Sequence, residues 1–319
     1  MSMVNNETGT VGPFILVTAI MHRPLLPVPS AFLLAASLLA FALQGQSKHT
    51  ANFSGERALD YTARTVAFGP RPDGSAAIAK LRSFIWRQLV ADGWEVTTDS
   101  FTAQTPDGPL PMENIIARLP GKSGAGTAIT GHYDTKKMAG FVGANDGGSS
   151  TGFLLELAGT LRNRPRADDI YLVFFDGEEA VREWSDTDSV YGSRHLAEKW
   201  TADGTVRKLK ALLNVDMIGD KNFRLVWETS SSPSLRKLVW DIADSLGYSA
   251  AFPREGGPVS DDHIPFINAG VRAVDLIDFE SQATFWHTPQ DTLDKLSARS
   301  FEIVGQVVLK TIEALEQQK

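Results

Sequence analysis

The chain has 319 residues, of which 43% are hydrophobic and 22% are charged, a composition that suits a globular protein with a sizeable core. Its formal net charge of −7, without a long block of like charge, argues against a nucleic acid or an anionic membrane surface as a partner, because both require a basic face. The absence of cysteine excludes disulfides, thiol nucleophiles and thiolate ligands, so any metal must be held by His, Asp and Glu.

An uncharged apolar run near the N-terminus predicts export. Residues 31–43 consist mainly of alanine, leucine and phenylalanine and follow Arg23. This run is short for a membrane span and has the length of a signal-peptide core. Met21 is a natural start for such a signal, so residues 1–20 are interpreted as an extension. We expect a secreted or periplasmic protein in which residues 1–43 are extension plus signal peptide; an uncleaved membrane anchor is the alternative.

The remainder of the chain is expected to be one catalytic domain over residues 54–319, joined by a short polar linker at residues 44–53. An apolar stripe, closed by Asp92-Gly93, predicts a helix over residues 76–93. Further segments follow in chain order: strands at 94–101, 114–119 and 127–130, a helix at 153–161, strands at 170–175, 212–218 and 271–277, and a helix at 301–315.

This alternation of strands and helices predicts an α/β fold with three layers, in which helices flank a mixed, mostly parallel sheet. The strand at 170–175 is apolar throughout, as is typical of a strand covered on both faces. Polar residues follow or end three of the strands: His132 and the segment 176–179 come just after their strands, and Asp216 lies within the end of the strand at 212–218. Ligands bind at the carboxyl ends of strands in such sheets, so these residues are expected to meet there.

His132 and Asp146 are candidates for a metal site. His132 follows a buried strand, and Asp134 is placed to orient it or a neighbouring ligand. A buried core histidine is the alternative. Asp146 lies in a glycine-rich stretch that opens the helix beginning near Ser150, where a negative charge is favourable. A simple capping role is its alternative.

Three carboxylates at Asp176, Glu178 and Glu179 stand directly after the apolar strand. Such a group is unfavourable unless a cation offsets its repulsion, although an exposed acidic loop is the alternative. One of two adjacent glutamates can bind a metal while the other acts as an acid and base. His287, beside a tryptophan, can complete the site, whereas His263 is interpreted as a structural residue.

These motifs resemble the zinc-dependent glutaminyl-peptide cyclotransferases of the animal and bacterial type, which are relatives of the dizinc aminopeptidases. The resemblance extends from Thr62 onward and includes Arg71 to Gly74, Glu113 to Ala117 and His132 to Lys136. Its most specific part is residues 174–197, FFDGEEAVREWSDTDSVYGSRHLA. Within it, an insertion at 181–191 carries a tryptophan and is a feature of the cyclases rather than of the aminopeptidases.

The resemblance implies a zinc exopeptidase-like fold and conversion of N-terminal glutamine of peptides or proteins to pyroglutamate, with release of ammonia. It also implies a cis peptide bond between Asp146 and Gly147. Position by position, it implies zinc ligands at Asp146, Glu179 and His287, a general acid and base at Glu178, an acidic pair at Asp216 and Asp261, and aromatic pocket walls at Trp184 and Trp286.

A zinc aminopeptidase is the alternative function. It would bind a second zinc ion through His132 and Asp216 and attack with a metal-bound water. All of these ligands are present, so the insertion that carries Trp184 is what favours a cyclase. A non-enzymatic domain is disfavoured because no ligand is missing. Ser260, Asp275 and the loop at 278–284 differ from the animal enzymes, which affects the expected substrate range more than the chemistry.

Overall fold

The computed structural model describes residues 12–13, 52–279 and 284–318, so the predicted signal segment lies outside the described residues. Over these ranges the chain forms a six-stranded sheet in the order β1-β2-β4-β3-β5-β6. The first two strands pair antiparallel and β2 also pairs antiparallel with β4, whereas β4, β3, β5 and β6 are parallel. The strands are β1 (Glu95–Thr105), β2 (Gly108–Leu119), β3 (Gly126–His132), β4 (Asp169–Phe175), β5 (Leu209–Asp216) and β6 (Ala273–Ile277).

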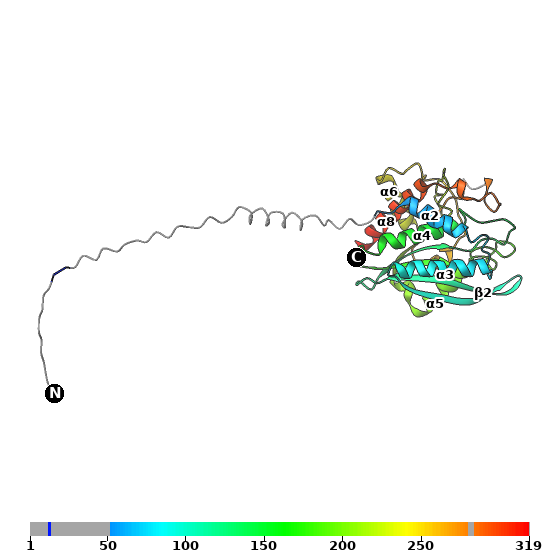
Figure 1. Cartoon of the computed structure of the whole chain (residues 1–319), viewed down its shortest axis with the longest axis horizontal. Helices are drawn as coiled ribbons and strands as arrows, with labels where there is room; N and C mark the ends of the chain where they lie inside the picture. Colours follow the sequence, from blue (N-terminus) through cyan, green and yellow to red (C-terminus); the bar gives the residue numbers. More distant parts are fainter. Residues whose placement is uncertain (1–11, 14–51, 280–283, 319) are drawn as a thin grey trace, which may run out of the picture. The chain divides into compact units, whose positions relative to one another are not determined.

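Helices cover both faces of this sheet. On one side lie α2, α3, α4, α6 and α8, and on the other lies α5, all labelled in Figure 1. Helix α7 packs on the same core as α5. Their bounds are α2 (Gly55–Val66), α3 (Ala76–Ala91), α4 (Gly148–Leu161), α5 (Tyr191–Asp203), α6 (Pro233–Ser245), α7 (His263–Asn268) and α8 (Ala298–Glu316). The predicted three-layer α/β architecture with a mixed, mostly parallel sheet is therefore confirmed.

Strand β4 shows how the sequence produces two cores. Its side chains alternate between the faces because successive residues of a strand point in opposite directions. Leu172 and Phe174 belong to the large core beneath α4 and α8, whereas Val173 and Phe175 belong to the smaller core beneath α5 and α7. Both sets are buried, which explains the continuous apolar run in the sequence.

Helix α2 was not predicted, nor were α5, α6 and α7. The residues that α2 buries fully are small or polar, namely Gly55, Ala58, Thr62 and Thr65, and its larger apolar residues Leu59 and Val66 are only partly buried against the core, so its apolar stripe is less evident in the sequence. Predicted strands differ from the observed ones mainly at their ends. Strand β5, expected at 212–218, ends at Asp216 because Met217 has a left-handed backbone with φ of 47°.

Close packing of α2 on α4 gives a stability prediction. A Cβ at Gly152 of α4 would clash with the Thr62 hydroxyl and lie 2.6 Å from the carbonyl oxygen of Ala58. We expect Gly152→Ala to lower the free energy of unfolding by about 1–3 kcal/mol, the usual cost of overpacking.

Gly159→Ala in the same helix is the matched control for this substitution. There the new Cβ would meet only an Asp92 carboxylate oxygen, at 3.6 Å. The better helix propensity of alanine should then raise the free energy of unfolding by about 0.5–1 kcal/mol. Urea unfolding measures both variants, and equal effects of the two substitutions would contradict the close packing of α2 on α4.

Candidate active site

The predicted polar residues gather at the carboxyl edge of the parallel strands. His132 ends β3 and Asp216 ends its neighbour β5, while Glu178 and Glu179 follow β4. Asp146 directly precedes the N-terminal turn of α4. The connection from β3 to β4 runs through α4 on one face, and the connection from β4 to β5 runs through α5 on the other. Connections that diverge in this way leave a crevice at the strand ends, where ligands bind in α/β sheets.

Asp146, Glu179 and His287 lie close enough to share one metal ion. Their ligand atoms lie within 4.8 Å of one another. The Nε2 atom of His287 is 3.3 Å from Oδ2 of Asp146 and 3.3 Å from Oε2 of Glu179. Both carboxylates are buried and the histidine is partly buried. One nitrogen and two carboxylate groups form a donor set that suits catalytic zinc.

Two orphaned oxygens support this fit. Oδ2 of Asp146 and Oε2 of Glu179 are buried without a hydrogen-bond partner. The single ring nitrogen between them carries at most one proton and cannot satisfy both. Burial alone would lower the pKa of His287, but its close contacts with the negatively charged carboxylates of Asp146 and Glu179 outweigh it and raise this pKa to about 9. A proton and a divalent cation therefore compete for the same place between these side chains.

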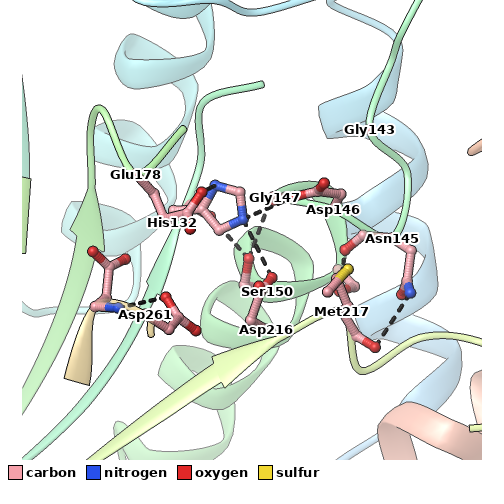
Figure 2. A network of polar contacts seen from close by, with 12 residues as sticks. His132, Gly143, Asn145, Asp146, Gly147, Ser150, Glu178, Asp216, Met217 and Asp261 are labelled. Carbon is pink, nitrogen blue, oxygen red and sulfur yellow. Dashed lines mark hydrogen bonds and ion pairs between the residues drawn. The ribbon is translucent and has the colours of Figure 1, made fainter. Parts of the chain in front are cut away.

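His132 defines a second group of possible ligands (Figure 2). Its Nε2 atom is 3.2 Å from Oδ1 of Asp146 and 3.2 Å from Oδ1 of Asp216, and these three residues also meet the distance condition for a metal ion. Asp134 lies 3.3 Å from the other ring nitrogen. Because both groups have suitable geometry and share Asp146, ligand positions alone do not distinguish one ion from two.

Glu178 lies beside the three possible ligands and is 6% exposed. Its Oε2 atom is 3.9 Å from Nδ1 of His132. Burial raises the pKa of Glu178 well above its ordinary value; the positive charge of His132 opposes this shift, and the negative charge of Glu179 adds to it. A carboxyl group with a raised pKa can both accept and return a proton near neutral pH.

The backbone around the site is held by two further carboxylates. Asp134 accepts hydrogen bonds from the backbone N–H groups of Glu178 and Glu179, at 3.3 and 3.2 Å. Asp291 accepts bonds from the backbone N–H groups of Asn145 and Asp146, at 2.8 and 3.0 Å. Asp291 was not predicted from the sequence, because a contact with backbone N–H groups leaves no pattern in the sequence.

A cavity of about 490 Å³ opens onto these residues. Trp184 and Trp286 line it and are 43% and 38% exposed. Trp286 stacks on His287 with ring centroids 4.0 Å apart and meets Phe279 edge-on at 5.2 Å. Phe279, which also lines the cavity, was not predicted as a site residue. The cavity therefore combines exposed aromatic rings with buried carboxylates.

Asp261 also lines the cavity and ends a buried polar chain. Its Oδ2 atom accepts a hydrogen bond from Asn214 at 2.9 Å, and the same amide donates to Asp275 at 3.2 Å. His263 lies 3.8 Å from Asp275 through Nδ1 and 3.2 Å from Glu228 through Nε2. His263 is fully buried and does not line the cavity, and with Asp261 and Asp275 it forms a third group that meets the distance condition for a metal ion, so its predicted structural role stays a prediction.

The implied cis bond after Asp146 is wrong, because no cis peptide bond occurs in the part of the chain that the structure describes. Gly147 has φ of 74° instead. A Cβ there would clash with the carbonyl oxygen of Asp134 and lie 3.0 Å from the ring of His132. A glycine therefore lets the backbone turn into α4 while passing close to the site.

Sequence comparison relates the chain to one peptidase family. The model of peptidase family M28 matches residues 114–312. A glutaminyl-peptide cyclotransferase of Drosophila melanogaster is 32% identical over 250 residues, which cover 70% of this chain and 70% of that protein. A glutaminyl-peptide cyclotransferase-like protein of Mus musculus is 32% identical over 253 residues, which cover 70% of this chain and 66% of that protein, slightly less than two thirds of its length.

Structural comparison leads in the same direction. The crystal structure of a glutaminyl cyclase from an Acidobacteriales bacterium superposes with a TM-score of 0.80 and 42% identity, covering 84% of this chain and 97% of that one. A zinc-dependent exopeptidase from Parabacteroides distasonis superposes with a TM-score of 0.73 and 25% identity, covering 84% of this chain and all of that one. Together with the site geometry, these relatives imply a bound metal.

Proposed function

Because the chain belongs to peptidase family M28 and, within it, to the glutaminyl-peptide cyclotransferases, we propose that it is a glutaminyl cyclase that converts an N-terminal glutamine of peptides or proteins into pyroglutamate. It is then an enzyme of the acyltransferase type. The observation that carries this proposal is the position of Glu178, a buried carboxyl group beside the cluster of Asp146, Glu179 and His287 and on the lining of an aromatic cavity.

The proposed metal is zinc, held by Asp146, Glu179 and His287. Support comes from the donor set, from the two orphaned carboxylate oxygens, and from the zinc-dependent exopeptidase among the structural neighbours. When bound, zinc acts as a Lewis acid on the γ-carbonyl group of the substrate.

Glu178 is the proposed general base and acid. Its carboxylate takes a proton from the α-amine of the substrate while that nitrogen forms a bond to Cδ, the carbonyl carbon of the side-chain amide. The bond between Cδ and the amide nitrogen then breaks, and Glu178 returns the proton to the departing ammonia. Because amine and carbonyl belong to one residue, holding them in the ring-forming geometry avoids the entropy cost of a bimolecular encounter.

Four further residues are proposed to shape the reaction. Asp216 and Asp261 lie close enough to Glu178 to influence its pKa and are proposed to hydrogen-bond around the reacting centre. Trp184 and Trp286 are proposed walls for the substrate, because both line the cavity. Aromatic walls exclude water, which would otherwise compete with the α-amine as the nucleophile.

A zinc aminopeptidase with two metal ions remains the second candidate. The group formed by His132, Asp146 and Asp216 specifically favours it, since this group also meets the distance condition for an ion. The loop that carries Trp184 favours the cyclase, because it supplies part of the cavity lining.

Ammonia release from a glutaminyl dipeptide tests the function. We expect the purified protein to release one ammonia per pyroglutamate formed, to lose this activity on treatment with a chelator, and to regain it when zinc is added back. Zinc content should be one ion per chain.

An aminoacyl anilide is the comparison substrate. Hydrolysis of this anilide without ammonia release from the dipeptide, together with two zinc ions per chain, would establish the aminopeptidase instead. Ammonia release that a chelator leaves unchanged would contradict the proposed metal.

We also propose that the protein is exported, on the basis of the apolar run at residues 31–43. This run lies outside the described residues. Within the ranges that the structure covers, no helix has both the length and the apolar character needed to cross a bilayer.

A further inference from the structure

The loop at residues 181–190 forms one side of the cavity and closes on itself. Arg182, Glu183 and Trp184 line the cavity. At the far end of the loop, the N–H of Val190 donates to the carbonyl oxygen of Glu178 at 2.8 Å, and the N–H of Tyr191 donates to that of Gly177 at 2.7 Å. Both ends therefore lie on the backbone segment that carries the two glutamates of the site.

A single carboxylate spans the interior of this loop. Asp188 is 3% exposed. Its Oδ1 atom accepts hydrogen bonds from the N–H of Val181 and the hydroxyl of Tyr191, both at 2.8 Å, and its Oδ2 atom accepts bonds from the N–H groups of Arg182 and Glu183, both at 2.9 Å. Four donors thus converge on one side chain.

Three consecutive backbone N–H groups that point at one place form an anion-binding nest. Here the N–H groups of residues 181–183 form the nest, and the carboxylate of Asp188 is the anion. This side chain therefore holds the beginning of the loop to its end. Hydrogen bonds to a charged acceptor are stronger than those between neutral groups. Burial alone would raise the pKa of Asp188, but the bonds from Glu183, Tyr191 and Arg182 lower it, which keeps the acceptor charged.

The last residue of the loop has a strained backbone conformation. Val190 has φ of 43°, a left-handed conformation that is unfavourable for a β-branched side chain. Such a conformation persists only where its surroundings hold it. Asp188 bonds to the residues at both ends of the loop and is therefore placed to hold this conformation.

We propose that Asp188 is a positioning residue that holds Arg182, Glu183 and Trp184 as the substrate-facing side of the cavity. Its hydrogen bonds go to other residues of the loop and to Tyr191, not to the possible metal ligands or to Glu178. The backbone of Glu178 and Glu179 is held separately, by Asp134. Removal of the charge at Asp188 should therefore disturb substrate binding while leaving the chemical step intact. The catalytic part of this inference rests on the proposed cyclase activity.

Asp188→Asn tests the proposal because it keeps the shape of the side chain and replaces one acceptor oxygen by a donor. We expect KM for a glutaminyl peptide to rise by about tenfold or more, since a small misplacement of positioning groups has effects of this size. We expect kcat to stay within about threefold of wild type. Limited trypsin digestion should also cleave faster after Arg182, whose side chain is exposed, as followed by the fragment that ends there.

Asp186→Asn is the matched control, because Asp186 is an exposed residue of the same loop that contributes its backbone carbonyl to a contact with Arg194. It should change neither KM nor the cleavage rate. Tyr191→Phe removes one of the four bonds and should raise KM by about threefold, which keeps the test decisive if Asp188→Asn does not fold.

An unchanged KM, a fall in kcat alone, or an unchanged cleavage rate in Asp188→Asn overturns the proposal. Tryptic cleavage needs no substrate, so it reports on the loop even if the wild-type protein does not cyclise glutamine. Absence of cyclase activity would then count against the proposed function, whereas the cleavage rate would decide the role of Asp188.

Discussion

Replacement of Glu178 by glutamine is expected to lower kcat for cyclisation by about a hundredfold to ten-thousandfold, the usual contribution of a general acid and base. The substitution keeps the size of the side chain but removes its ability to take a proton from the α-amine. Glu178 is not among the three residues proposed to bind zinc, so the variant should retain its metal. KM should change little, because the loss affects the transition state.

Ammonia release measures the expected fall in kcat, and elemental analysis measures the zinc that the variant is expected to retain. Glu183→Gln is the control, since Glu183 lines the same cavity and is exposed, and its loss should affect kcat far less. Loss of zinc in Glu178→Gln would mean that Glu178 is a ligand. Activity near that of the wild type would remove Glu178 from the mechanism.

His287→Ala is expected to have the second large effect, loss of the metal itself. The Nε2 atom of His287 is the only nitrogen among the three proposed ligands, and without it two buried carboxylates are left facing each other. Metal affinity should fall by more than about a hundredfold, since loss of an outer-shell partner alone costs up to that much. Ammonia release should fall with the zinc content.

Thermal unfolding gives a readout that does not depend on activity. Because a ligand that binds only the folded state stabilises it, a chelator should lower the Tm of the wild type but not that of His287→Ala. His195→Ala is the control, because His195 lies on α5 outside the cavity, and its Tm should still respond to the chelator. A variant that retains full zinc content would show that His287 is not a ligand.

Strand β4 was predictable because the signals that indicate it lie within its own stretch of sequence. The all-apolar strand at 170–175 and the polar residues after it place β4 and its loop without any knowledge of the partners. Helix α5, by contrast, begins after Val190 in a left-handed conformation and has no side-chain cap, so the sequence contains no start signal for it. Helix α7 has only six residues, one of which is Pro265, and is too short for a periodic pattern.

The possible metal ligands could be proposed from the sequence, whereas two carboxylates that hold the backbone around the cavity, Asp188 and Asp291, could not. Asp146, Glu179 and His287 were proposed as ligands from motifs and a family resemblance, and the structure brings their ligand atoms within 4.8 Å of one another. Asp188 and Asp291 had no such signal. Each accepts hydrogen bonds from N–H groups that every residue type except proline possesses, so only the fold identifies them.

Both ends of the loop at 181–190 meet on the segment that carries Glu178 and Glu179, and this attachment has a consequence for how substrate choice can change. Because its two ends meet on one short segment, we expect changes of length within the loop to leave the sheet, α4 and the ligand-bearing residues where they are. Substrate choice is therefore expected to vary with this loop, whereas the stability of the domain is expected to depend on the sheet and the helices that cover it.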